Sequence, residues 1–278
     1  MLNADLHCHS IVSDGVLTPT ELAARARVNG VDLWALTDHD EIGGIAEART
    51  AAQAIGLRYL AGVEISVTWA GATVHIVGLN IDETNPTLLA GLEATRGGRE
   101  QRAREIGRQL ALAGVPDAYE GALHYAGNPD LISRTHFARY IVETGVCDKI
   151  SDVFSKYLIE GKPGFVPHRW ATLAQAVNWI REAGGTAIVA HPGRYKYSDL
   201  QFDEFINEFK LHGGVAMEVV TGSHSVDQYD YYARLAKRYG LMASRGSDFH
   251  SPGESRVDLG QLPPLPNGLQ PVWESLPI

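Results

Sequence analysis

Imidazole and carboxylate side chains recur along this chain at the places where strand-like segments end. Nine of them fall in matching positions: His7, His9, Asp14, His39, Glu64, His75, His191, Asp248 and His250. Imidazole and carboxylate groups are the usual ligands of Zn, Mn and Fe ions in proteins. Because one zinc ion takes about four ligands, nine candidates indicate a site for two or three divalent metals. Sites of that kind often cleave phosphate esters.

The pair His7 and His9 shows how spacing supports this interpretation. Residues two apart on a strand point to the same side, so both rings face one way and Cys8 faces the other. A single histidine is more often a hydrogen-bonded structural residue than a ligand. The same placement in all the other candidates favours metal binding for the set, and Cys8 is interpreted as a packed thiol.

The composition is that of one large α/β domain, with or without an insertion. The chain has 278 residues, 45% of them hydrophobic, and a net charge of −9. Proteins that wrap duplex nucleic acid are more often basic, whereas a small phosphorylated ligand is compatible with this charge. Only two cysteines are present, Cys8 and Cys147, so a disulfide framework is excluded and a reducing compartment is favoured.

The start of the chain lacks the charged and apolar regions of a signal peptide, and no apolar run approaches the ~20 residues of a membrane span. We therefore expect a cytoplasmic protein that contacts no membrane, and nothing indicates an obligate protein partner.

Strand-like and helical segments alternate along most of the chain. The expected strands are 2–7, 32–37, 58–65, 73–79, 186–190, 214–220 and 241–244. The expected helices are 19–29, 45–55, 86–113, 172–183, 202–211 and 225–239, with a break at Gly97–Gly98 and an irregular tail from Gly260. Capping boxes begin the helices after Thr18 and Thr172. This alternation is typical of a parallel sheet with helical crossovers, and ligands from at least six strand ends favour a barrel.

The stretch 99–168 breaks this alternation. It is mostly helical, with 131–143 and 151–159 as the clearest helices, and we interpret it as an insertion that covers the site. The barrel then consists of 1–98 and 169–278. Around the start of this stretch, from residue 93 to residue 108, arginines alternate with glutamates. The arginines are Arg96, Arg99, Arg102, Arg104 and Arg108, and the glutamates are Glu93, Glu100 and Glu105. This pattern favours a solvated helix over an RNA-binding track.

The motifs that hold these candidates resemble those of the PHP phosphoesterase family. They are Asp5-Leu6-His7-Cys8-His9-Ser10, Thr37-Asp38-His39-Asp40, Gly62-Val63-Glu64, Ala190-His191-Pro192 and Ser247-Asp248-Phe249-His250. That family includes histidinol-phosphate phosphatases and the PHP domains of bacterial DNA polymerases. The resemblance implies a distorted seven-stranded α/β barrel that holds three divalent metals.

Carried over residue by residue, the resemblance implies three ligand sets. His7, His9, Glu64 and Asp248 would hold one ion; Glu64, His75 and His191 a second; Asp14, His39 and His250 a third. Water bridging two of these cations would lose its proton near neutral pH and attack phosphorus. An oxygen and nitrogen ligand set admits Mn²⁺, which we favour, as well as Fe²⁺ or Zn²⁺. Among the acids and hydroxyls beside the ligands (Asp5, Asp38, Asp40 and Ser247), one or two acids are expected to orient metal-bound histidines, the alternative being that they cap turns or helices.

Other residues are candidates for contacts with substrate. His224 follows a predicted strand and has no ligand role, so it is our candidate proton donor; the alternative is a histidine in a surface loop. Arg134 begins a predicted helix in the insertion, where a phosphate would bind well; the alternative is a surface salt bridge. Lys162, Arg169 and Arg194 are weaker candidates.

Within the family, the Ala-His-Pro motif and the segment Ser133-Arg134-Thr135-His136-Phe137-Ala138 are similar to one subgroup. Its members remove the 3′-phosphate of nucleoside 3′,5′-bisphosphates such as adenosine 3′,5′-bisphosphate, and some trim short RNA from the 5′ end. The resemblance implies the first activity here, with Arg134 anchoring the 5′-phosphate. The alternatives are a 5′-3′ exoribonuclease that stacks bases on Tyr125, Phe137, Tyr140 or Trp170, a histidinol-phosphate phosphatase, and a non-catalytic metal-stabilised module.

Overall fold

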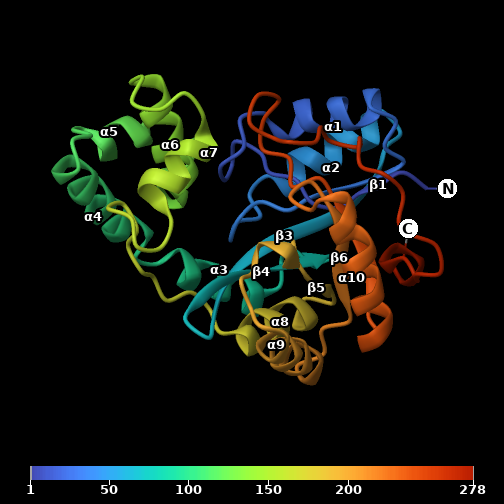
Figure 1. The fold of residues 1–278 in the computed structure, drawn as a ribbon. Coiled ribbons are helices and arrows are strands. Elements are labelled where there is room, and N and C mark those ends of the chain that lie inside the picture. The colour runs from blue at the N-terminus through green and yellow to red at the C-terminus, as the bar shows by residue number, and fades with distance from the viewer. Residues whose placement is uncertain (1, 278) are drawn as a thin grey trace.

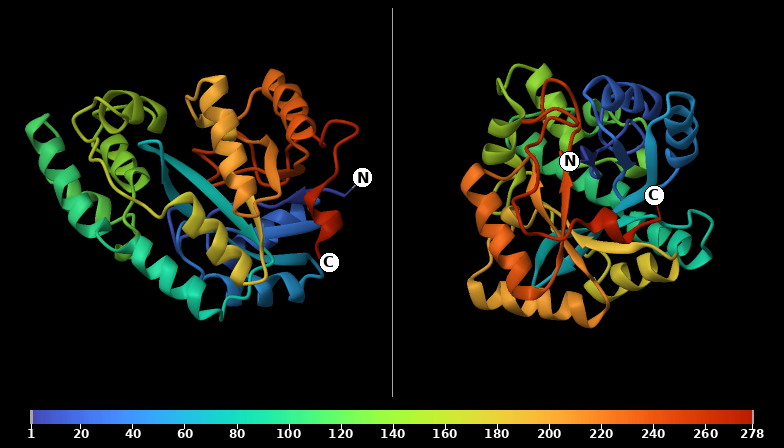
Figure 2. Two further views of the ribbon diagram at one scale, coloured as in Figure 1. Left: turned by 90° about the horizontal axis from the view of Figure 1, so that it is seen from below. Right: turned by 90° about the vertical axis from the view of Figure 1, so that its right-hand side faces the viewer.

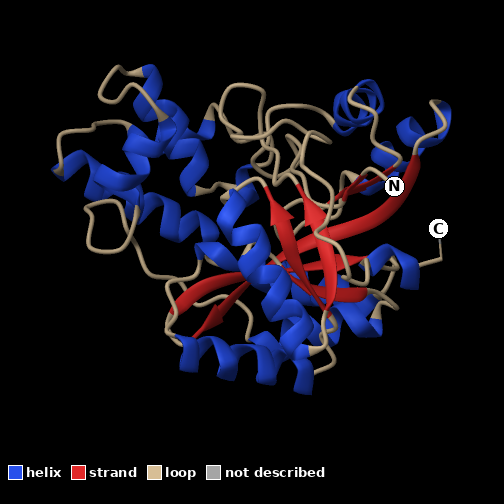
Figure 3. Cartoon of the chain, turned by 45° about the vertical axis from the view of Figure 1, so that its right-hand side comes forward, coloured by secondary structure: helices blue, strands red, loops and turns tan. Residues whose placement is uncertain are grey.

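One seven-stranded sheet forms the frame of the molecule in the computed structural model, which describes residues 2–277 (Figure 1). The strands are β1 (Ala4–Asp5), β2 (Leu33–Leu36), β3 (Arg58–Trp69), β4 (Ala72–Leu79), β5 (Thr186–Val189), β6 (Ala216–Thr221) and β7 (Met242–Gly246). The helices around the sheet are α1 (Pro19–Val28), α2 (Ile45–Ala54), α3 (Pro86–Arg96), α8 (Leu173–Glu182), α9 (Asp199–Leu211) and α10 (Val226–Tyr239). Figure 3 shows the strands running through the middle of this unit with helices outside them.

The sheet nearly closes into a barrel. Its strands lie side by side in chain order from β1 to β7, and the segments next to the first and last strands then meet. The amide of Leu6 donates to the carbonyl of Arg245 over 3.0 Å, and the amide of Asp248 donates to the carbonyl of His7 over 2.8 Å. The expected distorted seven-stranded barrel is therefore confirmed.

One strand departs from the expected parallel arrangement. β4 is antiparallel to both β3 and β5, whereas the other four pairings along the sheet are parallel. β3 and β4 form a hairpin whose turn contains Ala70 and Gly71, both with positive φ, and so short a connection joins only antiparallel strands. As a result, Glu64 and His75 lie within the strands of the hairpin. We had expected them at the carboxyl ends of strands, and this expectation was wrong.

Local sequence signals explain where several helices begin and end. Thr18 and Thr172 each cap a helix and form the expected capping boxes, with Glu21 and Gln175. The long helix expected over 86–113 is broken at Gly98, whose φ of +83° is a left-handed conformation that favours glycine. This break separates α3 from α4 and turns the chain away from the barrel.

A group of helices lies beside the barrel and packs around its own apolar cluster. Its members are α4 (Arg99–Leu112), α5 (Ala118–Leu123), α6 (Arg134–Glu143) and α7 (Ile150–Val153), followed by a π-helical turn, Phe154–Leu158. The cluster contains Ile106, Leu110, Phe137, Ile141 and Leu158, all buried. Figure 2 shows these helices on one side of the molecule and both chain ends on the other.

The barrel core is built from aliphatic strand residues with helices packed outside. All four residues of β2, Leu33–Leu36, are buried, as expected for a strand covered on both faces. The tail expected to be irregular contains one short 3-10 turn, Val272–Ser275, whose Trp273 packs on the core. Among the described helices, none combines the length and apolar character needed to cross a bilayer.

Candidate metal centre

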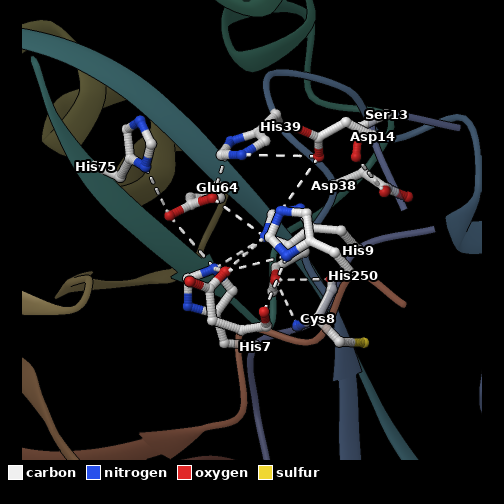
Figure 4. Close-up of polar contacts among 12 residues, drawn as sticks. His7, Cys8, His9, Ser13, Asp14, Asp38, His39, Glu64, His75 and His250 are labelled. Carbon is white, nitrogen blue, oxygen red and sulfur yellow. Dashed lines mark hydrogen bonds and ion pairs between the residues drawn. The ribbon is translucent and has the colours of Figure 1, made fainter. Parts of the chain in front are cut away.

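The nine predicted ligands converge in one cluster. Figure 4 labels seven of them: His7, His9, Asp14, His39, Glu64, His75 and His250. The ligand atoms of all nine form four overlapping groups in which all atoms lie within 4.8 Å of one another. The groups are His9, Asp14, His39 and His250; His7, His191 and Asp248; His7, His9 and Glu64; and His39, Glu64 and His75. The sulfur of Cys8 points away from them and donates to the carbonyl of Ala35, so the expected packed thiol is confirmed.

Glu64 occupies the middle of this cluster because the β3–β4 hairpin carries it across the end of the barrel. Its Oε1 lies 2.9 Å from Nε2 of His191 and 3.0 Å from Nδ1 of His75. Its Oε2 lies 2.8 Å from Nδ1 of His39 and 3.3 Å from Nε2 of His9. A fully buried carboxylate that faces imidazoles with both oxygens is well placed to bridge two cations.

The spacing of the ligand atoms fits divalent metal ions. Ligand atoms bound about 2.1 Å from one ion lie about 3.0–3.4 Å apart. Nε2 of His7 and Nε2 of His9 are 3.2 Å apart, and Nε2 of His9 is 3.2 Å from Oδ1 of Asp248. Oδ1 of Asp14 and Oε2 of Glu64 are buried without a hydrogen-bond partner among residues 2–277. Buried carboxylate oxygens of this kind need a cation, so the donor set and its geometry both suit metals.

The carboxylates of the cluster are ionised. Burial alone would raise the pKa of Glu64, but the surrounding imidazoles, above all His75 and His39, hold it well below its usual value. The pKa values of Asp14 and Asp248 are also well below the usual value for the same reason. Ionised carboxylates are the form that binds metal.

Burial and neighbouring carboxylates act in opposite directions on the pKa values of His9, His191 and His39. Burial lowers the pKa of His9 to about 3, and burial likewise lowers that of His191 to about 3, so both rings are neutral and ready to bind metal. Burial also acts to lower the pKa of His39, but Glu64 and Asp14 raise it to about 9. Metal binding at His39 would therefore release a proton.

Glu218 supports the cluster from behind and was missed in the sequence. Its Oε1 lies 2.8 Å from Nδ1 of His7, and its Oε2 accepts the amide of His191 over 2.6 Å. This contact directs Nε2 of His7 toward the site, which is the orienting role expected of a carboxylate behind a metal ligand. A lone glutamate inside the apolar strand β6 was the only sequence signal for this role.

The acids that we expected to orient metal-bound histidines serve other groups. Asp5 accepts the amides of Ser247 and Gly260, over 2.8 and 2.6 Å. Asp38 accepts the amide and hydroxyl of Ser10 and thereby holds the loop that leads to Asp14. Asp40 accepts the amide and hydroxyl of Ser66, over 2.7 and 2.8 Å. These carboxylates organise backbone turns, so the alternative reading of them was the correct one.

A cavity of about 350 Å³ lies between the metal cluster and the helical insertion. Five of the predicted ligands line it, together with aromatic and hydroxyl residues and four arginines: Arg99, Arg102, Arg134 and Arg194. Arg134 is in the first turn of α6, donates to the carbonyl of Leu158 over 3.1 Å and lies over the ring of Phe154. Arg194 pairs with Asp248 over 3.0 Å. The structure thus brings Arg134 and Arg194 to the predicted ligands.

The arginine stripe of α4 is only partly the solvated surface that we expected. Arg104 and Arg108 are exposed and pair with glutamates of the same helix. Arg99 is buried, pairs with Asp40 and has its guanidinium 4.6 Å from the centre of the Trp170 ring. Arg102 lies over the same ring at 5.4 Å. Charge alternation alone does not show which side of a helix faces a neighbouring cavity.

Two other basic candidates are not in the cavity. Lys162 is exposed and lines a different hollow beside Glu105, and Arg169 is exposed outside the cavity lining. Of the aromatic candidates, Trp170 lines the cavity. The remaining three pack or bond elsewhere: Phe137 in the insertion core, Tyr125 with Glu143, and Tyr140 with the carbonyl of Pro116.

His224 is not placed as a proton donor. Its Nε2 accepts the amide of Gly193 over 2.9 Å, and its Nδ1 lies 3.0 Å from the carbonyl of Val219. Both ring nitrogens are thus engaged by the backbone, the ring stacks on Tyr232, and burial lowers the pKa to about 4. We therefore do not carry His224 forward as the proton donor: burial keeps the ring neutral, and its backbone partners are not visible in the sequence.

Comparison with known proteins gives a consistent result. The model of the PHP domain matches residues 5–158. A 3′,5′-nucleoside bisphosphate phosphatase from Chromobacterium violaceum is 50% identical over 99% of this chain and 97% of its own length. A 5′-3′ exoribonuclease from Haemophilus influenzae is 45% identical over 97% of both chains.

Solved structures agree with the fold. The structure of an amidohydrolase from Chromobacterium violaceum, with sulfate bound and no metal, has a TM-score of 0.96 at 50% identity, covering 98% of this chain and 95% of that one. A protein from Bifidobacterium adolescentis described as a metal-dependent phosphoesterase has a TM-score of 0.81 at 27% identity, covering 97% and 92%. With its nine converging ligands and these matches along its whole length, the chain belongs to the PHP domain family of metal-dependent phosphoesterases.

Proposed function

We propose that this protein is a metal-dependent phosphatase that removes the 3′-phosphate of nucleoside 3′,5′-bisphosphates and releases nucleoside 5′-monophosphates. The observation that carries the proposal is one cavity lined both by predicted metal ligands and by four arginines. A nucleoside bisphosphate carries two anionic groups, so the metal ions can bind one of them and the arginines the other. The relative from Chromobacterium violaceum that bears this activity in its name is similar over the whole chain.

The ligands are proposed to hold two to three divalent ions. We assign His7, His9, Glu64 and Asp248 to one ion, Glu64, His75 and His191 to a second, and Asp14, His39 and His250 to a third. When bound, such ions would activate water and take up charge on the phosphoryl oxygens. The ionised carboxylates Glu64, Asp14 and Asp248 would neutralise the ions and fix their positions.

Arg134 is proposed to hold the 5′-phosphate. Its guanidinium is fixed by the carbonyl of Leu158 and the ring of Phe154, so little side-chain freedom would be lost on binding. It also stands in the first turn of α6, where the helix dipole favours an anion. Arg102 lines the same side and would add a second cation.

The helical insertion is proposed to act as a separate unit, residues 99–168, that closes the cavity from the side opposite the barrel. It carries Arg134 and also touches the metal cluster, because the hydroxyl of Ser133 donates to Oδ2 of Asp14 over 3.0 Å. The insertion would therefore set the distance between the two phosphate positions and select substrates of matching length.

We further propose that the bound metal is manganese and that the protein is cytoplasmic. The ligand atoms are all nitrogen and oxygen, a set compatible with Mn²⁺, and the nearest thiol, Cys8, points away from them. Both cysteines are buried and free, a state that a reducing compartment maintains.

A second candidate activity is 5′-3′ removal of nucleotides from short 5′-phosphorylated RNA. Trp170 and Phe154 line the cavity and offer surfaces on which bases can stack. Relatives from Haemophilus influenzae and Escherichia coli, 45% and 42% identical, are named as 5′-3′ exoribonucleases. Both activities would use the same phosphate-binding groups.

The test is phosphate release by the Mn-loaded protein from adenosine 3′,5′-bisphosphate, with histidinol phosphate and 5′-phosphorylated RNA in parallel. We expect fast release from the bisphosphate, and in Arg134→Ala a KM raised about tenfold or more because a charged hydrogen bond is lost. Arg238→Ala, an exposed arginine of α10, is the matched control. The proposal would be refuted if the protein hydrolysed histidinol phosphate faster than the bisphosphate, or if it hydrolysed no phosphate ester.

A further inference from the structure

A second cavity opens beside the metal centre. It measures about 240 Å³ and shares Thr135, Phe154, Arg194 and His250 with the first cavity. The two cavities are therefore adjacent, and the predicted ligand His250 is among the side chains that they share. The nucleoside bisphosphate of the proposed function would bind in the first cavity, and no part of it would lie in the second.

The second cavity offers polar groups without partners. Arg256 lines it, is exposed, and forms no ion pair within the described part of the chain. The hydroxyl oxygen of Ser223 is buried and lacks a hydrogen-bond partner in residues 2–277. The nearby acid Glu254 is already engaged, because Arg139 holds both of its oxygens at 2.7 Å. The remaining free charge on this wall is positive and suits an anion.

The chemistry of the proposed reaction shows what would need such a space. Hydrolysis of a 3′-phosphate breaks the bond between phosphorus and the 3′-oxygen. If the same phosphorus also carries the 5′-oxygen of another nucleotide, that nucleotide must extend out of the metal centre. It cannot extend into the first cavity, which holds the nucleoside being released, so it needs an opening on the other side of the centre.

We propose that the second cavity is the subsite for the nucleotide on the 3′ side of the scissile phosphate in a 5′-phosphorylated oligoribonucleotide. This inference rests on the second activity under the proposed function, the cleavage of short RNA, and assigns a place and two residues to the departing nucleotide. Water adds its oxygen to phosphorus, the bond to the 3′-oxygen breaks, and that oxygen takes up a proton. The products are a nucleoside 5′-monophosphate and a remainder that keeps the phosphate on its 5′ end. Arg256 binds the backbone of this remainder, and Ser223 donates to it.

The test compares two substrates that differ only in the group assigned to this subsite. They are adenosine 3′,5′-bisphosphate and the 5′-phosphorylated dinucleotide pApA, each given to the Mn-loaded full-length protein. Arg256→Ala removes the free cation, and Ser223→Leu fills the cavity with carbon. Arg238→Ala, outside both cavities, is the control, and thermal melting verifies that each variant is folded.

We expect both variants to lower kcat/KM for pApA about tenfold or more and to leave kcat/KM for the bisphosphate unchanged, since a lost charged contact has an effect of that size. In water enriched in ¹⁸O, the label should appear in the 5′-phosphate of the released mononucleotide that came from the 3′ side. Equal losses on both substrates, or no loss on either, would overturn the subsite. A parent protein that hydrolyses the bisphosphate but not pApA would overturn the subsite and the second candidate activity and would leave the proposed bisphosphate phosphatase standing. Failure on the bisphosphate would overturn that phosphatase activity.

Discussion

Glu218 shows how a metal centre depends on a residue that is not expected to bind metal. One of its oxygens faces the ring N–H of His7, and the other accepts the amide of His191. In Glu218→Gln, the side-chain NH₂ group faces either the ring N–H of His7 or the amide of His191, and neither of these groups can accept its hydrogen bond. The orientation of the His7 ring is then lost. We expect Mn²⁺ affinity, measured by titration calorimetry, to fall about tenfold or more.

The control for this change is Glu208→Gln. Glu208 lies on α9 and accepts from the indole of Trp69, away from the predicted ligands. Its substitution should leave metal affinity as it is in the parent protein. Equal affinities in all three proteins would show that Glu218 does not orient a ligand.

His224 gives a prediction that separates structure from chemistry. His224→Phe leaves the amide of Gly193 and the carbonyl of Val219 without their partner, so the free energy of unfolding should fall by about 1–3 kcal/mol. Denaturant unfolding measures this loss. The dependence of kcat on pH should be the same in His224→Phe as in the parent protein. If a folded His224→Phe variant lost the decrease of kcat at high pH, His224 would again be the candidate proton donor.

The same residue predicts a dependence of stability on pH. Burial lowers its pKa from 6.5 to about 4 in the folded protein, so the unfolded chain binds the proton more tightly. Its contribution to stability is present above pH 6.5 and is lost as the pH falls toward 4. The parent protein should therefore lose more stability across this window than His224→Phe does.

Single residues differ in how well the sequence reveals them. Seven of the nine predicted ligands lie in recognisable motifs, Asp14 and His75 were added from their placement, and the structure brings all nine together. Glu218 is 211 residues from His7 in the chain, so nothing local links the two. In the sequence, Arg99 does not differ from the other arginines of its helix. Only the fold shows that its guanidinium lies over the ring of Trp170. Partners that meet only through tertiary folding leave no local signal.

At the scale of elements, α6 connects substrate binding to the metal centre. Ser133 caps this helix by accepting the amide of Thr135, and its hydroxyl also donates to Asp14. Ser133→Ala should lower the free energy of unfolding by about 1 kcal/mol. It should also raise KM for the bisphosphate more than it lowers kcat, because Arg134 stands on the first turn of the same helix.

A second capping serine provides the matched control. Ser198 caps α9 with a similar box formed with Gln201, and it does not line the cavity. Ser198→Ala should show a similar loss of stability and an unchanged KM. If both variants change KM equally, the effect of Ser133 is a general loss of stability and the connection to the site is absent.

Elements with strong local signals were predictable, and their long-range pairing was less so. The capping boxes after Thr18 and Thr172 and the break at Gly98 are local and were found. The two strands of the hairpin were also expected. Their antiparallel pairing, which places Glu64 within β3 and His75 within β4, depends on how strands pair around the barrel.

At the scale of the whole molecule, charge is distributed in a way that favours small anions. The net charge is −9, yet four arginines line the cavity beside the predicted ligands. An acidic molecule repels long nucleic acid, whereas a recessed cavity with a positive wall attracts short phosphorylated ligands. The barrel carries the predicted metal ligands and the helices beside it carry Arg134, so under the proposed function both parts are needed to bind the two phosphates.

The identity of the product from adenosine 3′,5′-bisphosphate tests the central claim most directly. The Mn-loaded protein would be given this substrate, and the nucleotide formed would be identified by chromatography together with the phosphate released. We expect adenosine 5′-monophosphate and one phosphate, because in the proposed function the metal centre binds the 3′-phosphate and Arg134 the 5′-phosphate. Formation of adenosine 3′-monophosphate, or no release of phosphate, would contradict it.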